Sequence, residues 1–199
     1  MSLNSQDIVQ QVESQLKAHP NATLQITAKK LGITEQLITD ALREVEGVSF
    51  QEFRAGKRLE QAFGQLNEFS IASNGPSERR ARRRSIIPKA TVKYSIHSFW
   101  RFRSAYSSQC PLVDFGSDGL ALLADESVEP QKRISLVLKF PGEEKTIQIE
   151  GTVAYSVATG IAGYRYRIGI QFLPFDKRKG GNTPRVLETL TRIEKTYPK

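Results

Sequence analysis

The chain has 199 residues, 39% of them hydrophobic and 25% charged, which is typical of a globular protein rather than a disordered or fibrous one. The single cysteine, Cys110, excludes an internal disulfide and a cysteine-rich zinc site. The start of the chain carries Asp7 and Glu13 and no apolar run, so we expect neither a signal peptide nor a membrane span, and a cytoplasmic location.

The net charge of +8 is distributed unevenly. Residues 1–70 hold 7 Lys and Arg against 9 Asp and Glu, whereas residues 71–199 hold 22 against 12. A cationic surface favours anionic partners such as nucleic acid, lipid head groups or a phosphorylated ligand. We therefore expect an anion-binding site in the C-terminal part of the chain.

Helical periodicity fills the first seventy residues. It predicts a helix over Ser5 to Lys17, a short helix near Thr27 to Leu31 ended by a turn at Gly32, and a third helix over Glu35 to Glu46 with Thr34 as its N-cap. The third helix is expected to turn five apolar side chains inward: Leu37, Ile38, Ala41, Leu42 and Val45. Ser49 and Glu52 form a capping box that predicts the start of a fourth helix.

The helix, glycine turn and helix form a helix-turn-helix pattern. Residues 27–62 resemble one helix-turn-helix unit of the AraC type, in which the helix after the turn enters the DNA major groove. Attraction to phosphate supplies most nonspecific affinity for DNA, so the charge of that helix matters. It is acidic, which disfavours DNA binding and favours contact with a protein or simple helical packing: Glu35, Asp40, Glu44 and Glu46 stand against Arg43 alone.

Residues 71–88 are rich in polar residues and arginine and are predicted to be a linker that buries no apolar area. Five arginines lie within six residues, namely Arg79, Arg80, Arg82, Arg83 and Arg84. The planar guanidinium group matches phosphate oxygens and stacks on purines, so a ligand that carries both would use both properties. A solvated basic linker or a nucleic-acid-binding patch is the alternative.

Alternating apolar residues then predict short antiparallel strands at the spacing of a closed barrel. The expected strands are Thr91 to Ile96, Trp100 to Tyr106, Leu112 to Phe115, Leu120 to Leu123, and stretches near 134–140, 147–155 and 166–172. Thr183 as N-cap and Pro184 at the first helical position predict a C-terminal helix that leans on the barrel.

The segment from Val113 to Leu120 has the pattern of a strand, a tight turn and a second strand. Asp114 can accept hydrogen bonds from the N1 and N2 donors of a guanine, and Gly119 allows the turn and a close backbone approach. A plain hairpin with a capping aspartate is the alternative.

Residues 79–176 resemble a PilZ domain, a bacterial receptor module for cyclic di-GMP whose motifs are R-x-x-x-R before the first strand and [DN]-x-S-x-x-G after the second. Arg80 with Arg84, or Arg79 with Arg83, matches the first motif. The stretches 149–153 and 166–172 resemble later strands of the family. In that family the arginines hold phosphates and guanine edges, the aspartate and serine contact a guanine, and the glycine shapes the turn.

Gly116 departs from the second motif, because the family has a serine there. Ser117 or Asp118 could substitute for the missing hydroxyl group, and the loss of one such hydrogen bond costs on the order of 1 kcal/mol of binding free energy, several-fold in affinity. Weaker or altered binding is therefore compatible with the resemblance.

The predicted fold is α+β with two domains: a helix-turn-helix-like domain at 1–70, an arginine-rich linker at 71–88, and an antiparallel six- or seven-stranded PilZ-type barrel with its C-terminal helix at 89–199. The resemblance implies a non-enzymatic effector that binds cyclic di-GMP and reorients the helical domain toward a protein partner. The implied ligand-binding residues are Arg79, Arg80, Arg83, Arg84, Asp114, Gly116, Ser117 and Gly119, without catalytic residues, cofactor or metal. A DNA-binding transcription regulator and an adaptor whose barrel has lost its ligand remain as alternatives.

Overall fold

The computed structural model describes residues 4–72, 85–97, 105–176 and 181–197. The chain divides into two compact units, Met1–Ala62 and Phe63–Lys199. The boundary between them falls within one helix, α4 (Phe50–Ala72). None of the described helices combines the length and hydropathy needed to cross a lipid bilayer.

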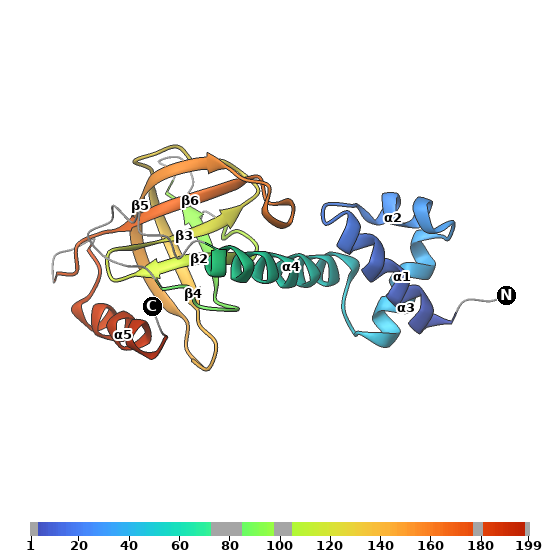
Figure 1. Ribbon diagram of the computed structural model, residues 1–199, viewed down its shortest axis with the longest axis horizontal. Helices are drawn as coiled ribbons and strands as arrows, with labels where there is room; N and C mark the ends of the chain where they lie inside the picture. The colour runs from blue at the N-terminus through green and yellow to red at the C-terminus, as the bar shows by residue number, and fades with distance from the viewer. Residues whose placement is uncertain (1–3, 73–84, 98–104, 177–180, 198–199) are drawn as a thin grey trace. The chain divides into compact units, whose positions relative to one another are not determined.

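Three short helices and the first part of α4 form the N-terminal unit (Figure 1): α1 (Ser5–Ala18), α2 (Leu24–Leu31) and α3 (Glu35–Val45). Each short helix begins after a polar residue whose side chain accepts a backbone N–H of the first turn, namely Asn4, Thr23 and Thr34. Gly32 ends α2 in the left-handed conformation. The predicted capping box is confirmed, because the Ser49 hydroxyl accepts the Glu52 N–H at 3.3 Å and Glu52 accepts the Ser49 N–H at 2.9 Å.

The buried stripe of α3 is narrower than the sequence predicts. Ile38, Ala41 and Leu42 are buried, whereas Leu37 and Val45 are 43% and 39% exposed. Leu37 lies about 100° around the helix from Ile38, on the flank of the stripe. Val45 is the last residue of the helix. The prediction that these two side chains face inward is therefore wrong.

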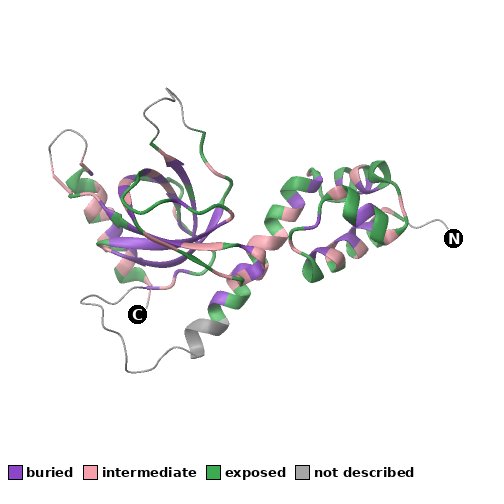
Figure 2. Ribbon diagram, turned by 90° about the horizontal axis from the view of Figure 1, so that it is seen from above, coloured by how far each residue is buried: buried purple, intermediate pink, exposed green. Residues whose placement is uncertain are grey.

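Six antiparallel strands close into a barrel (Figure 1). Their order is β1-β2-β3-β6-β5-β4, and β4 pairs back to β1. This confirms the predicted antiparallel barrel, which has six strands among the described residues. Buried residues gather in the strands (Figure 2). In the barrel core the rings of Phe115 and Phe140 meet edge to face with centroids 5.4 Å apart. The strands are β1 (Thr91–Ile96), β2 (Cys110–Gly116), β3 (Gly119–Ala124), β4 (Arg133–Lys139), β5 (Ile147–Ala158) and β6 (Tyr166–Phe172).

Two segments differ from the sequence-based expectation. Residues 100–104 of the predicted strand from Trp100 to Tyr106 lie outside the described residues, and Ala105 and Tyr106 are not in a strand. At the end of the predicted linker, Ile87 is 1% exposed and belongs to the barrel core. The expectation that this stretch buries no apolar area is therefore wrong at its C-terminal end.

The C-terminal helix α5 (Pro184–Thr196) packs on the barrel as predicted, with Leu190 and Ile193 in the barrel core. The Arg192 guanidinium donates two hydrogen bonds to Glu143, at 2.8 and 3.0 Å, and holds the pKa of that carboxyl below its usual range. The Tyr197 hydroxyl donates to the backbone oxygen of Pro141 at 3.1 Å. These contacts fix the helix to the connection between β4 and β5.

Candidate functional site

A β-bulge in β2 turns Asp114 to the outer face of the barrel. Leu112 pairs with Leu122 and Asp114 pairs with Ala121, so one residue of β2 is extra. Strict alternation would place Leu112 and Phe115 on opposite faces, yet both belong to the core. The bulge restores Phe115 to the core and leaves its neighbour Asp114 outside, where it is still only 6% exposed.

The carboxylate of Asp114 is held by Arg167 of β6. Nη2 of Arg167 donates to Oδ2 of Asp114 at 2.5 Å, and the arginine side chain is 34% exposed. β3 lies between β2 and β6, so the arginine crosses one strand on the outer face to reach the carboxylate. A buried carboxylate needs such a partner, because its removal from water is otherwise costly. Arg167 lies outside both sequence motifs, and the sequence does not predict it as a site residue.

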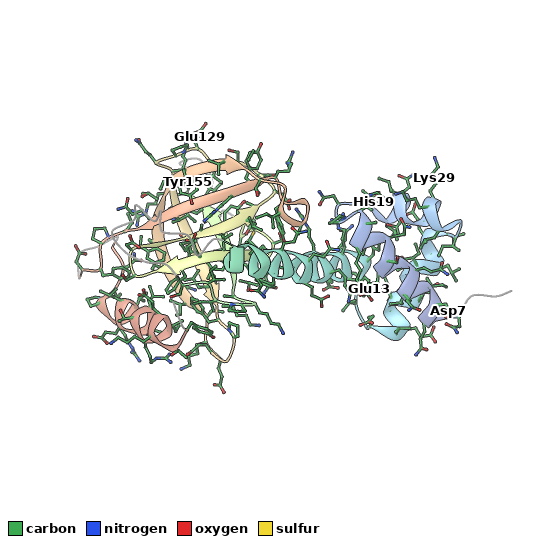
Figure 3. The ribbon with its side chains drawn as sticks, viewed as in Figure 1. Asp7, Glu13, His19, Lys29, Glu129 and Tyr155 are labelled. Carbon is green, nitrogen blue, oxygen red and sulfur yellow. The ribbon has the colours of Figure 1, made fainter. Side chains whose placement is uncertain are left out.

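One row of paired residues crosses the outer face from Asp114. Asp114 pairs with Ala121, Ala121 with Gly169, and Gly169 with Tyr155 of β5. The ring of Tyr155, labelled in Figure 3, occupies the space that a side chain at Gly169 would need. Two small residues therefore separate the carboxylate from the aromatic ring.

The hairpin after Asp114 brings together the other predicted residues of the second motif. Gly116 pairs with Gly119, and Ser117 and Asp118 form the turn between them. Both glycines are buried and Ser117 is half-buried. Neither glycine has a positive φ. The turn therefore does not require glycine at either position for a left-handed backbone.

The predicted arginines Arg79, Arg80, Arg83 and Arg84 lie outside the described residues. The next residue, Ser85, is bridged to β2: its N–H donates to the Phe115 oxygen at 2.7 Å, and the Phe115 N–H donates to the Ser85 oxygen at 2.9 Å. Phe115 stands between Asp114 and Gly116 in β2. Arg84 directly precedes Ser85 in the chain, so the run of arginines from Arg79 to Arg84 (the arginine run) ends one residue before this bridge.

A second polar cluster joins the end of β1 to β4 and β5. Nε2 of His97 lies 2.7 Å from the Ser135 hydroxyl and 3.1 Å from Oε2 of Glu150, and Ser135 itself donates to Glu150 at 2.5 Å. In a catalytic triad the serine and the acid contact different ring nitrogens. Here one nitrogen faces both, so the cluster is not arranged as a nucleophile, base and acid. Within the described part of the chain, no group of three or more His, Cys, Asp and Glu residues could hold a metal ion.

The family model of the PilZ domain matches residues 78–186, more than half of the chain. No curated protein matches the chain. The match extends across the six-stranded barrel and the hairpin that carries Asp114. It does not cover residues 27–62, and no comparison supports the resemblance of that segment to the AraC type.

Solved structures similar to the chain include three PilZ-related or motility proteins at low identity. The PlzA protein of Borreliella burgdorferi in complex with c-di-GMP is 17% identical, with a TM-score of 0.36, over 66% of this chain and 46% of that chain. The inhibitor of motility MotI/DgrA of Bacillus subtilis is 18% identical, with a TM-score of 0.36, over 63% of this chain and 58% of that one. A tetrameric PilZ domain protein of Xanthomonas campestris is 13% identical, with a TM-score of 0.32, over 93% of this chain and 78% of that one. This chain thus spans about half the length of the first two proteins.

Proposed function

Because the chain belongs to the PilZ domain family, we propose that it is a bacterial second-messenger effector that binds cyclic di-GMP. The observation that carries the proposal is the bridge between Ser85 and Phe115. Ser85 directly follows Arg84 in the chain, and Phe115 stands between Asp114 and Gly116. The bridge therefore supports the proposal that the two motifs that resemble the family's ligand-binding motifs act on one ligand.

The chemistry of the two motifs complements that of the ligand. Cyclic di-GMP carries two phosphates, for which the guanidinium forks of Arg80 and Arg84, or of Arg79 and Arg83, are suitable donors. Each guanine presents N1–H and N2–H donors, which a carboxylate such as Asp114 can accept. Gly116 and Gly119 carry no side chain that would stand between a ligand and the backbone, and Ser117 offers a hydroxyl group in the same turn.

The arginine run lies between α4 and β1 in the chain, which suggests how binding could be transmitted. We propose that ligand held by this segment and by the β2–β3 hairpin reorients the N-terminal helical unit toward a protein partner in the cytoplasm. This role requires no catalytic step. DNA is a poor partner for the helical unit, because α3 and its C-cap carry four acidic side chains and one arginine.

Isothermal titration of the full chain tests the proposal. We expect saturable binding of cyclic di-GMP, and affinity for cyclic di-AMP at least about tenfold lower, because adenine lacks the N1–H and N2–H donors that would face Asp114. Absence of binding to cyclic di-GMP would contradict the proposal and favour the adaptor whose barrel has lost its ligand.

The departure at Gly116 gives a second prediction. The backbone of Gly116 is not in the left-handed region, so its conformation tolerates a side chain. We expect Gly116→Ser to bind cyclic di-GMP several-fold more tightly, since one added hydrogen bond contributes about 1 kcal/mol. Titration of this variant beside Gly160→Ala, a change at an exposed loop position with open space around it, checks the result. Equal affinity would mean that Ser117 or Asp118 already supplies the hydroxyl or carboxyl group. Weaker affinity would mean that the buried position has no room for the added side chain.

A further inference from the structure

The carboxylate proposed to recognise guanine is already held by another protein group. Nη2 of Arg167 donates to Oδ2 of Asp114, whose side chain is 9% exposed. The terminal torsion of an aspartate is broad, so hydrogen bonds rather than rotamer preference decide where its oxygens point. The bond from Arg167 therefore contributes to the direction of the acceptor that a base would meet.

Arg167 is in turn constrained by the sheet. It pairs with Leu123 of β3. Leu123 and Ala121, which is the next residue along β3 on the same outer face, are both fully buried. Nε of Arg167 is buried and has no hydrogen-bond partner among the described residues. With Nε covered and Nη2 on the carboxylate, the guanidinium has little freedom to turn elsewhere.

We propose that Arg167 is a positioning residue for ligand recognition, which orients Asp114 so that its oxygens meet the N1–H and N2–H donors of a guanine. The inference rests on the proposed function and adds a residue outside both motifs. A carboxylate has about four acceptor positions, so a bond from Arg167 does not by itself prevent Asp114 from accepting hydrogen bonds from a guanine edge. Arg167 acts through Asp114 and needs no contact with the ligand.

The first test compares Arg167→Met with a matched control in the full chain. Arg165→Met removes the same charge two residues away, where Nε of Arg165 donates to the backbone oxygen of Asp125 at 2.8 Å. We expect Arg167→Met to bind cyclic di-GMP about tenfold to one-hundredfold more weakly than wild type, and Arg165→Met to stay within about twofold. Equal affinities of the two variants would overturn the inference.

A double-mutant cycle separates positioning from direct contact. If Arg167 acts through Asp114, adding Arg167→Met to Asp114→Asn changes affinity by no more than about twofold, because the positioned carboxylate is already gone. The preference for cyclic di-GMP over cyclic di-AMP should fall in Arg167→Met, a change that a general loss of fold would not produce. A full loss in the Asp114→Asn background would make Arg167 a direct ligand contact and overturn the inference.

The outcomes remain distinguishable if a variant fails to fold. Should Arg167→Met be unfolded by circular dichroism, Arg167→Lys decides, because lysine keeps the charge but not the planar guanidinium. Wild-type affinity and base preference in Arg167→Lys would then overturn the inference. A wild-type chain that binds no cyclic di-GMP would overturn the proposed function and this inference with it, whereas normal wild-type binding with an unaffected Arg167 variant overturns the inference alone.

Discussion

Replacement of Arg80 and Arg84 by alanine is expected to weaken the binding of cyclic di-GMP by at least about one-hundredfold. Each arginine would lose charge-assisted hydrogen bonds to phosphate, and such bonds contribute about 1.5 to 3 kcal/mol apiece. The loss should come without unfolding, because the barrel core is built from other residues. Isothermal titration measures the affinity, and circular dichroism checks that the variant is folded.

The control for this prediction removes the same charge elsewhere. Arg43 on α3 and Arg185 on α5 are both exposed, so Arg43→Ala with Arg185→Ala lowers the net charge equally without touching the arginine run. We expect this pair to change affinity by about twofold at most, since long-range attraction to exposed charges is largely screened at physiological salt. If both double variants lose the same affinity, the arginines contribute only general charge. If Arg80→Ala with Arg84→Ala binds as wild type does, neither arginine takes part.

Local signals in the sequence predict most of the elements. The capping box at Ser49 and Glu52 and the N-cap at Thr34 involve residues three apart, so the pattern that forms them is visible in the chain itself. The same holds for β6, where alternation from Tyr166 to Phe172 predicts a strand with the bounds observed. The second motif also folds locally, because a turn of two residues, Ser117 and Asp118, joins Gly116 to Gly119.

The contacts of the site depend on strand order, which local patterns do not reveal. Arg167 of β6 contacts Asp114 of β2 because only β3 lies between these two strands in the barrel. In the chain, β4 and β5 separate β6 from β3. The alternation of β6 places Arg167 on the outward side, but this leaves open which strand it faces. The bulge beside Asp114 is equally hidden, since it appears only when Leu112 and Phe115 are both found in the core. The row of paired residues from Asp114 to Tyr155 on the outer face could not be predicted without knowing the order and register of the strands.

Phe115 connects the barrel core to the candidate site, and Phe115→Ala is expected to have the largest effect on stability. Its side chain is fully buried, with ring centroids 5.4 Å from Phe140 and 6.4 Å from Phe172. Truncation of a buried phenylalanine leaves a cavity and costs about 3 to 5 kcal/mol of the free energy of unfolding. For a protein of this size, the melting temperature of the barrel should fall by roughly 10 °C. Differential scanning calorimetry measures the shift.

Tyr106→Ala is the matched control, because it removes an aromatic side chain that is 48% exposed in the same unit. Exposed substitutions change stability by about 0.5 kcal/mol or less, so its melting temperature should stay near that of wild type. Saturating cyclic di-GMP should raise the melting temperature of Phe115→Ala if the variant still binds, because ligand that binds the folded state stabilises it by mass action. If Phe115→Ala melted at the same temperature as Tyr106→Ala, the core would have closed around the missing ring, and the expected loss of stability would be contradicted.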